Sequence, residues 1–350
     1  MGYILHKYSD YLPEKSSFEP QWREISWGGV IFRSGGVAWN AKKNYYLCRV
    51  LSAFCEIACD EPSCRAIGRF CGTKNNENKV AGAKILCVCQ EIFPYLPESP
   101  IATTCRTLSQ AMQERGFEIR TFMPRFGCIN ERRNQLHEVI RLSGMNLIIN
   151  DNDHQLIIKV ASIPAARVQI YFIDNDEFFA PRKSTFRTAE GEEFADNDQR
   201  AIFFARGVLE TVKKLRWQPD VVHCHSWFTA AVPLYLRNCY TDEPLFSSSK
   251  IVFSIYDDSF SGVWGEAFRE TMLGEGVPAE KLGPEGGLTY ENVVKLVIDN
   301  ADGIVVEAEH LPAEVENYLA ASGKRVLRPT GEPASDERLA QYKEFYDSIL

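Results

Sequence analysis

Two histidines and a tryptophan stand close together in the run His223-Cys-His225-Ser-Trp227. Residues two apart in a strand point to the same face, so both imidazoles could meet one ligand, either a metal ion or the hydroxyl groups of a sugar. The indole of Trp227 would offer a flat surface for a sugar ring. Since no third metal ligand is in range, we expect no metal at His223 and His225. Backbone and solvent contacts are the simpler alternative to a hydroxyl-binding pocket.

Carboxylates stand at two further places where an element is expected to begin or end. Asp257 and Asp258 follow an apolar run, but neighbouring loop residues need not face each other, so a turn or capping role is simpler than an acid/base pair. Asp196, Asn197 and Asp198 precede a long amphipathic stretch and form a good helix N-cap cluster. Their side chains could also reach a sugar.

Phosphate and zinc sites are both poorly supported by the sequence. The segment 90–101 contains three prolines and no glycine, so its backbone amides are poorly suited to cradle a phosphate. The chain contains neither a P-loop nor a Gly-x-Ser-x-Gly motif. Four cysteines near the start have no paired Cys-x-x-Cys spacing and no histidine nearby, which argues against zinc: Cys55, Cys59, Cys64 and Cys71.

The composition is that of an ordinary globular protein, with 45% hydrophobic and 25% charged residues in a chain of 350. A net charge of -8 argues against a nucleic-acid partner, which clustered Lys and Arg would hold. No run approaches the roughly 18 apolar residues of a membrane span, and residues 1–13 lack the apolar stretch of a signal peptide. We therefore expect no membrane partner, a cytoplasmic location and reduced cysteines.

From Lys84 onward, short apolar runs alternate with longer amphipathic stretches, which is typical of an α/β protein with a buried parallel sheet. Strands are predicted at 84–89, 118–123, 220–225, 250–256 and 303–307. Helices are predicted at 102–115, 198–215, 290–300 and 312–321. The ranges 154–161 and 167–173 predict a small β-hairpin insertion. The expected fold is a Rossmann-like parallel sheet flanked by helices.

Three parts of the chain are expected. Residues 1–80 show no sustained helix or strand period and end in a polar, linker-like stretch, so we expect a poorly defined or disordered N-terminal extension. Residues 81–328 hold the α/β domain. Residues 329–350 form a C-terminal helix with Ser335 as its N-cap and an apolar stripe that needs a surface to cover.

Segments along the α/β part resemble, in the same order, the N-terminal domain of bacterial glycogen and starch synthases. They are Lys84 to Pro94, Gln113 to Phe126, Asp196-Asn197 before a helix with Arg200, Pro219 to Trp227, Lys250 to Ile255 and Asn292 to Val306. The likeness covers roughly Lys84 to Val326. It implies a GT-B fold, in which two Rossmann-like domains face each other. It also implies transfer of α-1,4-linked glucose from ADP-glucose to a glucan without a metal or other cofactor.

The resemblance also implies which residues would meet the substrate: Glu91, Asp196, Asn197, His223, His225, Trp227 and Asp257. Other positions depart from the family. Its Lys-x-Gly-Gly-Leu loop, which approaches the donor phosphates, is Pro97-Glu-Ser-Pro-Ile101 here. A family Asp is Ser226, and a substrate-facing His is Phe228. The family's His-Asn pair is Tyr256-Asp257, so we expect no intact catalytic residues.

After Val326 the chain passes through 329–333 into its last helix, so we expect no counterpart of the family's donor-binding half. Because cations stabilise the leaving diphosphate, their loss predicts poor ADP-glucose binding and impaired catalysis. The resulting hypothesis is a truncated, glycogen-synthase-like subunit that binds or regulates α-glucan such as glycogen or maltooligosaccharide. Two alternatives are an active half completed by a donor-domain protein partner, and a non-catalytic scaffold.

Overall fold

The computed structural model describes residues 22–27, 30–35, 82–164 and 166–350. The chain divides into two compact units, Met1–Asn75 and Asn76–Leu350. In the first unit, β1 (Trp22–Trp27) and β2 (Val30–Gly35) pair as an antiparallel hairpin, which the sequence analysis did not predict. The four cysteines between residues 55 and 71 lie outside the described residues. So do most of residues 1–80, for which the sequence analysis predicts disorder.

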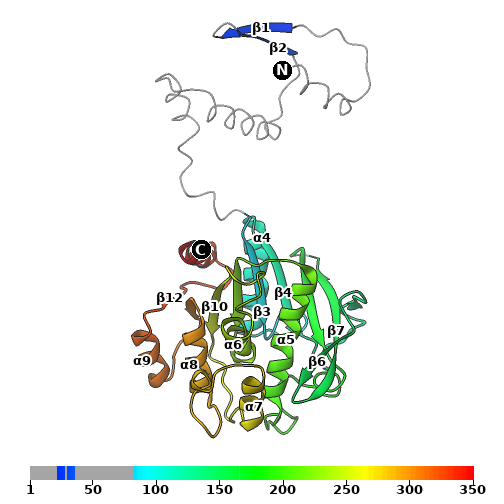
Figure 1. Ribbon diagram of the computed structural model, residues 1–350, viewed down its shortest axis with the longest axis vertical. Coiled ribbons are helices and arrows are strands. Elements are labelled where there is room, and N and C mark those ends of the chain that lie inside the picture. Colours follow the sequence, from blue (N-terminus) through cyan, green and yellow to red (C-terminus); the bar gives the residue numbers. More distant parts are fainter. Residues whose placement is uncertain (1–21, 28–29, 36–81, 165) are drawn as a thin grey trace. The chain divides into compact units, whose positions relative to one another are not determined.

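The second unit is built on one large sheet, which Figure 1 shows at its centre. Its strand order is β12-β11-β10-β9-β3-β4-β8-β7-β5, with β6 paired to β7. Every pair from β12 to β8 is parallel, and the pairs that β7 makes are antiparallel. The strands are β3 (Lys84–Cys89), β4 (Glu118–Pro124), β5 (His137–Glu138), β6 (Met145–Ile149), β7 (Asn152–Ile163), β8 (Val168–Asp174), β9 (Val221–His225), β10 (Lys250–Ile255), β11 (Gly303–Val306) and β12 (Arg325–Leu327).

The five strands predicted in the series and the two strands of the hairpin are confirmed. The hairpin is not a separate insertion, however, because β8 also pairs in parallel with β4 and so extends the main sheet. Strands β5, β6 and β12 were missed. At least half of the residues in each of these strands are exposed or half-buried, so the strands lack the continuous apolar run that is typical of a buried strand.

The predicted helices are also confirmed. The helices are α4 (Pro100–Glu114), α5 (Asn197–Leu215), α6 (Ala231–Asn238), α7 (Glu266–Gly274), α8 (Tyr290–Asn300), α9 (Ala313–Ala321) and α10 (Asp336–Ile349). Ser335 caps α10 as expected, because its hydroxyl accepts a hydrogen bond from the backbone N–H of Arg338. No range had been predicted for α6 or α7.

The order of the strands decides where the helices lie. The chain leaves β3 for β4 in one direction and later adds β9, β10, β11 and β12 in the other. Since parallel crossovers are right-handed, α4 falls on one face of the sheet and α5, α6 and α8 fall on the opposite face (Figure 1). The direction therefore switches between β3 and β9. Open α/β sheets bind ligands at such a point, beyond the carboxyl ends of the strands.

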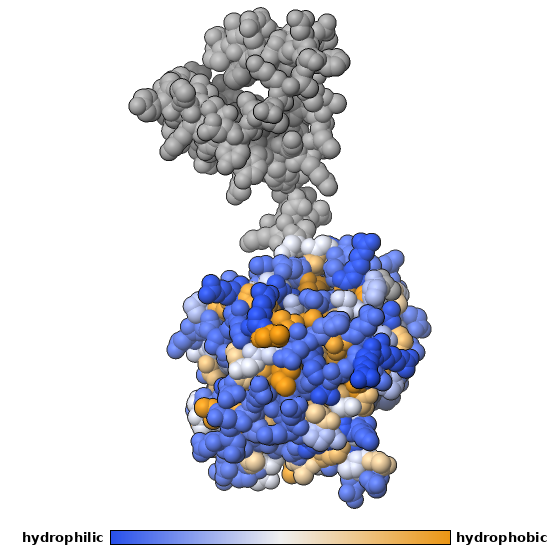
Figure 2. All heavy atoms as spheres, turned by 90° about the vertical axis from the view of Figure 1, so that its right-hand side faces the viewer, coloured by the Kyte–Doolittle hydropathy of each residue, from blue (hydrophilic) through white to orange (hydrophobic). Residues whose placement is uncertain are grey.

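The surface of the second unit shows no large apolar area on the face seen in Figure 2, where hydrophobic residues form small separate areas among hydrophilic ones. Large exposed hydrophobic side chains such as Ile140, Ile148 and Val263 come from different elements or loops. Among the described residues, no helix has both the length and the apolar character needed to cross a membrane.

The last helix packs on the same side of the sheet as α4, and its predicted apolar stripe is buried. Polar bonds fix its position as well. Tyr346 Oη lies 2.7 Å from His223 Nδ1 on β9, and Tyr342 bonds to the carboxylate of Glu307, which follows β11. The helix is therefore held by specific bonds to two strands in addition to apolar packing.

Replacing Tyr346 with Phe is expected to lower the free energy of unfolding by about 1 to 3 kcal/mol, because it leaves His223 Nδ1 buried without a partner. The control is Tyr318→Phe, which also removes a bonded hydroxyl but from a side chain at the surface. Its effect should stay within about 0.5 kcal/mol. Urea unfolding followed by circular dichroism measures both, and equal effects would show that the bond to His223 does not hold the helix.

Candidate functional site

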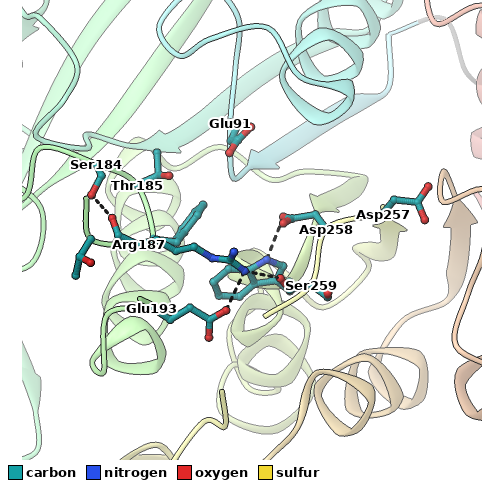
Figure 3. Close-up of a pocket in the computed structure, with 11 residues that line it drawn as sticks. Glu91, Ser184, Thr185, Arg187, Glu193, Asp257, Asp258 and Ser259 are labelled. Carbon is teal, nitrogen blue, oxygen red and sulfur yellow. Dashed lines mark hydrogen bonds and ion pairs between the residues drawn. The ribbon is translucent and has the colours of Figure 1, made fainter. Parts of the chain in front are cut away.

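A cleft of about 590 Å³ opens at the switch point, beyond the carboxyl ends of β3, β9 and β10. Figure 3 shows Glu91 just after β3. It also shows Arg187, which belongs to the β8–α5 loop and extends across the cleft. The remaining lining comes from residues 184–188, Glu193, Trp227 and residues 257–259. The cleft therefore gathers loops from three neighbouring strands and from one long connection.

The carboxylate of Asp258 joins the ends of three strands. Its Oδ2 accepts hydrogen bonds from Gln90 Nε2 at 2.7 Å, from Trp227 Nε1 at 3.0 Å and from Ser226 Oγ at 3.1 Å. Gln90 follows β3, while Ser226 and Trp227 follow β9. The expected turn or capping role is therefore wrong for Asp258, because its partners lie far away in the sequence. Its bonds fix the indole of Trp227 at the wall of the cleft.

Burial shifts the acidity of two carboxyl groups at this edge. Removal from water raises the pKa of Asp258, while the bonds from Gln90, Ser226 and Trp227 oppose the rise. Burial also raises the pKa of Glu91, with a hydrogen bond from Ser99 Oγ acting against it and the negative charge of Asp258 adding to it. Both groups are thus less acidic than free carboxyls.

The backbone turns sharply at Ser226, between β9 and the short 3₁₀ turn Trp227–Thr229. Its φ of 68° lies in a region that favours glycine and typically costs a serine about 1 to 3 kcal/mol. Two bonds hold the turn: the Ser226 N–H donates to the carbonyl of Ser254 at 3.0 Å, and the hydroxyl donates to Asp258. This turn carries Trp227 from the end of the strand into the cleft wall.

The two histidines do point to one face, as predicted, with ring centroids 3.9 Å apart. That face lies under α10 and not at the cleft, and both side chains are fully buried. His223 bonds to Tyr346 and Ser254, and His225 Nδ1 lies 2.9 Å from Tyr256 Oη. The expected backbone and solvent contacts are therefore wrong, since other side chains take their place.

The residues at the start of α5 support the wall of the cleft. Asp196 stands at the N-cap position but makes no capping bond, so that expectation is wrong; it pairs instead with Arg182 Nη2 at 2.5 Å. Asn197 is buried and donates to the carbonyl of Phe186 at 3.0 Å, and its Oδ1 accepts from Arg200 Nη1 at 2.6 Å. It also lines a small cavity of about 130 Å³ beside Trp227.

Of the residues proposed from the resemblance, the structure brings Glu91, Trp227 and Asp257 to the main cleft. Asp257 accepts a hydrogen bond from the backbone of Glu309 at 2.7 Å and also lines two neighbouring pockets. Asn197 is at the smaller cavity, and Asp196, His223 and His225 line none of these pockets.

Sequence reasoning missed three residues of the site. Gln90 is buried and connects Asp258 to the backbone N–H of Phe228, and its place directly after β3 was the available signal. Arg187 and Glu193 form an ion pair at 3.0 Å across the β8–α5 loop. Glu193 also accepts from the backbone N–H groups of residues 261 and 262. No periodic pattern in the sequence marks that loop.

The departures from the family pattern have clear places in the structure. Phe228 is fully buried in an aromatic cluster with Phe126, Phe186 and Phe204 and so presents nothing to the cleft. In the loop 97–101, Ser99 caps α4 by accepting from the backbone N–H of residue 102 and donates to Glu91. This loop carries no basic side chain.

The open, mostly parallel sheet and its cleft at the switch point define a Rossmann-like domain of the GT-B type. Residues 84–314 match the starch synthase catalytic domain, and the chain belongs to that family. Glycogen synthase of Chlorobium luteolum is 35% identical over 226 residues, which is 63% of this chain and 44% of that protein. Glycogen synthase of Chlorobaculum tepidum is 34% identical over 227 residues, 65% of this chain and 46% of that one.

A solved structure has the same fold. It is the catalytic domain of starch synthase IV from Arabidopsis thaliana bound to ADP and acarbose, with a TM-score of 0.58 and 18% identity, covering 71% of this chain and 52% of that one. These comparisons confirm the family resemblance and the fold class. The chain spans less than half the length of the two glycogen synthases.

Replacing Asp258 with Ala is expected to lower the free energy of unfolding by about 2 to 3 kcal/mol, because it leaves the buried donors of Gln90 and Trp227 unpaired. The matched control is Asp257→Ala, which removes one bond at a more exposed carboxylate and should cost less than about 1 kcal/mol. Urea denaturation with tryptophan emission compares them. If Asp257→Ala were the more damaging change, Asp258 would not be the centre of this network.

Proposed function

We propose that the second unit binds an α-glucan in this cleft and supplies the acceptor side of glycogen or starch synthesis. The observation that carries the proposal is Trp227, fixed by Asp258 in the wall of a polar cleft. The small exposed part of the Trp227 ring gives the cleft an apolar contact for a sugar ring, and carboxylates such as Glu91 and Asp257 accept hydrogen bonds from sugar hydroxyl groups. The glycogen synthases among the relatives support an α-glucan as the sugar.

The charges in the cleft favour a neutral ligand over a diphosphate. The lining residues include four carboxylates, from Glu91, Glu193, Asp257 and Asp258, against the single cation of Arg187. That cation is already paired with Glu193. A sugar diphosphate would add negative charge to this edge, where the donor loop 97–101 offers no compensating base.

We therefore propose that this chain, acting alone, transfers glucose from ADP-glucose poorly and serves mainly to bind or regulate glucan. If a partner protein carries a donor site, it would have to face this same edge of the sheet, and copurification of such a protein would identify it. A scaffold that never touches sugar is the remaining alternative, and glucan binding by the cleft would reject it.

Replacing Trp227 with Phe is expected to weaken glycogen binding about tenfold, a loss of about 1.4 kcal/mol, because the smaller ring fills less of the cleft wall and cannot donate to Asp258. Trp217→Phe is a close control. Trp217 is equally buried and also donates to a carboxylate, that of Glu118, but does not line the cleft. Affinity electrophoresis in gels containing glycogen measures both, and equal mobility changes would place the glucan elsewhere.

Incorporation of glucose from ADP-glucose into glycogen is expected to be at least about 10³-fold slower for the purified chain than for an intact glycogen synthase, because removing even one group that stabilises developing charge costs about 10² to 10³. The assay needs high protein concentration and a boiled sample as background. Turnover near that of the intact enzyme would show that the carboxylate-rich cleft and the loop 97–101 are compatible with donor binding.

A further inference from the structure

Three side chains that commonly bind metals meet beneath the cleft, on the α4 side of the sheet. Cys89 ends β3 and His225 ends β9, and these two residues are direct neighbours in the sheet register. Cys105 reaches them from α4. One possible ligand atom from each lies within 4.8 Å of the other two, and the three side chains are at most 1% exposed.

The imidazole of His225 supplies independent evidence for a ligand. Its Nδ1 is engaged with Tyr256 Oη at 2.9 Å, but its Nε2 is buried and has no hydrogen-bond partner. An unpaired polar atom in the interior costs free energy, and nearly all such atoms in folded proteins have a partner. The two cysteines are free thiols, so no disulfide uses them. Thiols and an unpaired imidazole nitrogen are the donor set of a soft or borderline cation.

We propose that Cys89, Cys105 and His225 bind one zinc ion, which joins β3, β9 and α4 beneath the cleft. Zinc–sulfur bonds of about 2.3 Å at tetrahedral angles place two sulfur ligands about 3.8 Å apart, which is within the 4.8 Å that bounds the distances among the three ligand atoms. The three side chains would fill three of the four tetrahedral positions, and a small ligand such as water would take the fourth. This cluster joins His225 to two cysteines and does not include His223, so it differs from the histidine pair considered in the sequence analysis. Both cysteines lie far from His225 in the sequence, and only the sheet and α4 bring them together.

Charge favours Zn²⁺ over the other soft candidate, Cu⁺. The net charge of Zn²⁺ with two thiolates and one neutral imidazole is zero, which suits a site shielded from water. With Cu⁺ the same ligands would keep a negative charge in the interior, near the carboxylate of Glu307. Tyr256 would accept the Nδ1–H of His225 and so fix the ring, as second partners of metal-bound histidines usually do.

The proposed ion is structural and takes no part in glucan binding. Tyr256, which bonds His225, also lines a pocket of about 260 Å³ beside Glu91 and Asp258. Tyr256 thus stands between the zinc ligands and the edge of the sheet that carries the cleft. The ion would fix the ends of β3 and β9 on the α4 side of the sheet. Asp258 fixes the residues that follow these two strands at the cleft.

The test uses the full chain with the five cysteines of the first unit replaced by serine, so that any metal bound belongs to the second unit: Cys48, Cys55, Cys59, Cys64 and Cys71. Metal-free protein is dialysed against Zn²⁺, and bound metal is counted by elemental analysis. Co²⁺ in place of Zn²⁺ gives thiolate charge-transfer absorption in the near ultraviolet. Binding should also release the two thiol protons.

One zinc per chain is expected, with a Kd below about 1 µM, a cobalt–thiolate absorption band and a higher thermal midpoint with zinc than without it. Cys105→Ser should weaken binding at least about 100-fold. The control Cys87→Ser changes another buried cysteine of β3 outside the cluster and should bind normally.

Three outcomes would overturn the proposal. They are no bound zinc in the parent protein, an equal loss of zinc binding in Cys105→Ser and Cys87→Ser, or binding of Cu⁺ without binding of Zn²⁺. Because the cobalt spectrum is recorded on the parent protein, the test holds even if Cys105→Ser fails to fold. Glycogen binding is measured separately, so the zinc site and the glucan cleft can fail independently.

Discussion

The cleft depends on one carboxylate, that of Asp258. Three parallel strands end side by side at this edge of the sheet, and each continues into a loop with its own direction. The Oδ2 of Asp258 accepts from Gln90 after β3 and from Ser226 and Trp227 after β9, so the three loops can take only one arrangement. Bonds to a charged acceptor are stronger than neutral ones, and here they help to offset the strained backbone at Ser226.

The architecture was largely readable from the sequence because buried parallel strands are continuous apolar runs and surface helices repeat with a period of 3.6. The predictions that failed concerned partners and directions. Strand alternation places His223 and His225 on one face but does not say which, and that face proved to lie under α10. Asp258 was interpreted through its neighbours in the chain, whereas one of its partners lies 168 residues away. Local patterns carry no information about such contacts.

The two faces of the central strands differ in chemistry, and this difference explains the packing of the helices. Phe228, which follows β9, packs among other aromatic rings close to α5. On the α4 side, His223 and His225 place polar atoms in the interior, where each unpaired atom is costly. Tyr346 of α10 and Tyr256 at the end of β10 satisfy two of these atoms. The helix that covers this face must therefore bring polar groups in the correct register, which apolar packing alone would not require.

The departures from the family pattern act in the same direction, although they come from separate segments. Where the resemblance implies an aspartate, this chain has Ser226, and the carboxylate of Asp258 accepts hydrogen bonds from the Ser226 hydroxyl and from the indole of Trp227. The loop around Pro97 provides no base, and the cation of Arg187 is paired with Glu193. A diphosphate entering this edge would have to separate that ion pair and approach several carboxylates. A neutral ligand rich in hydroxyl groups would need neither, since those groups can donate to the same carboxylates, and so the electrostatics of the cleft favour neutral over anionic ligands.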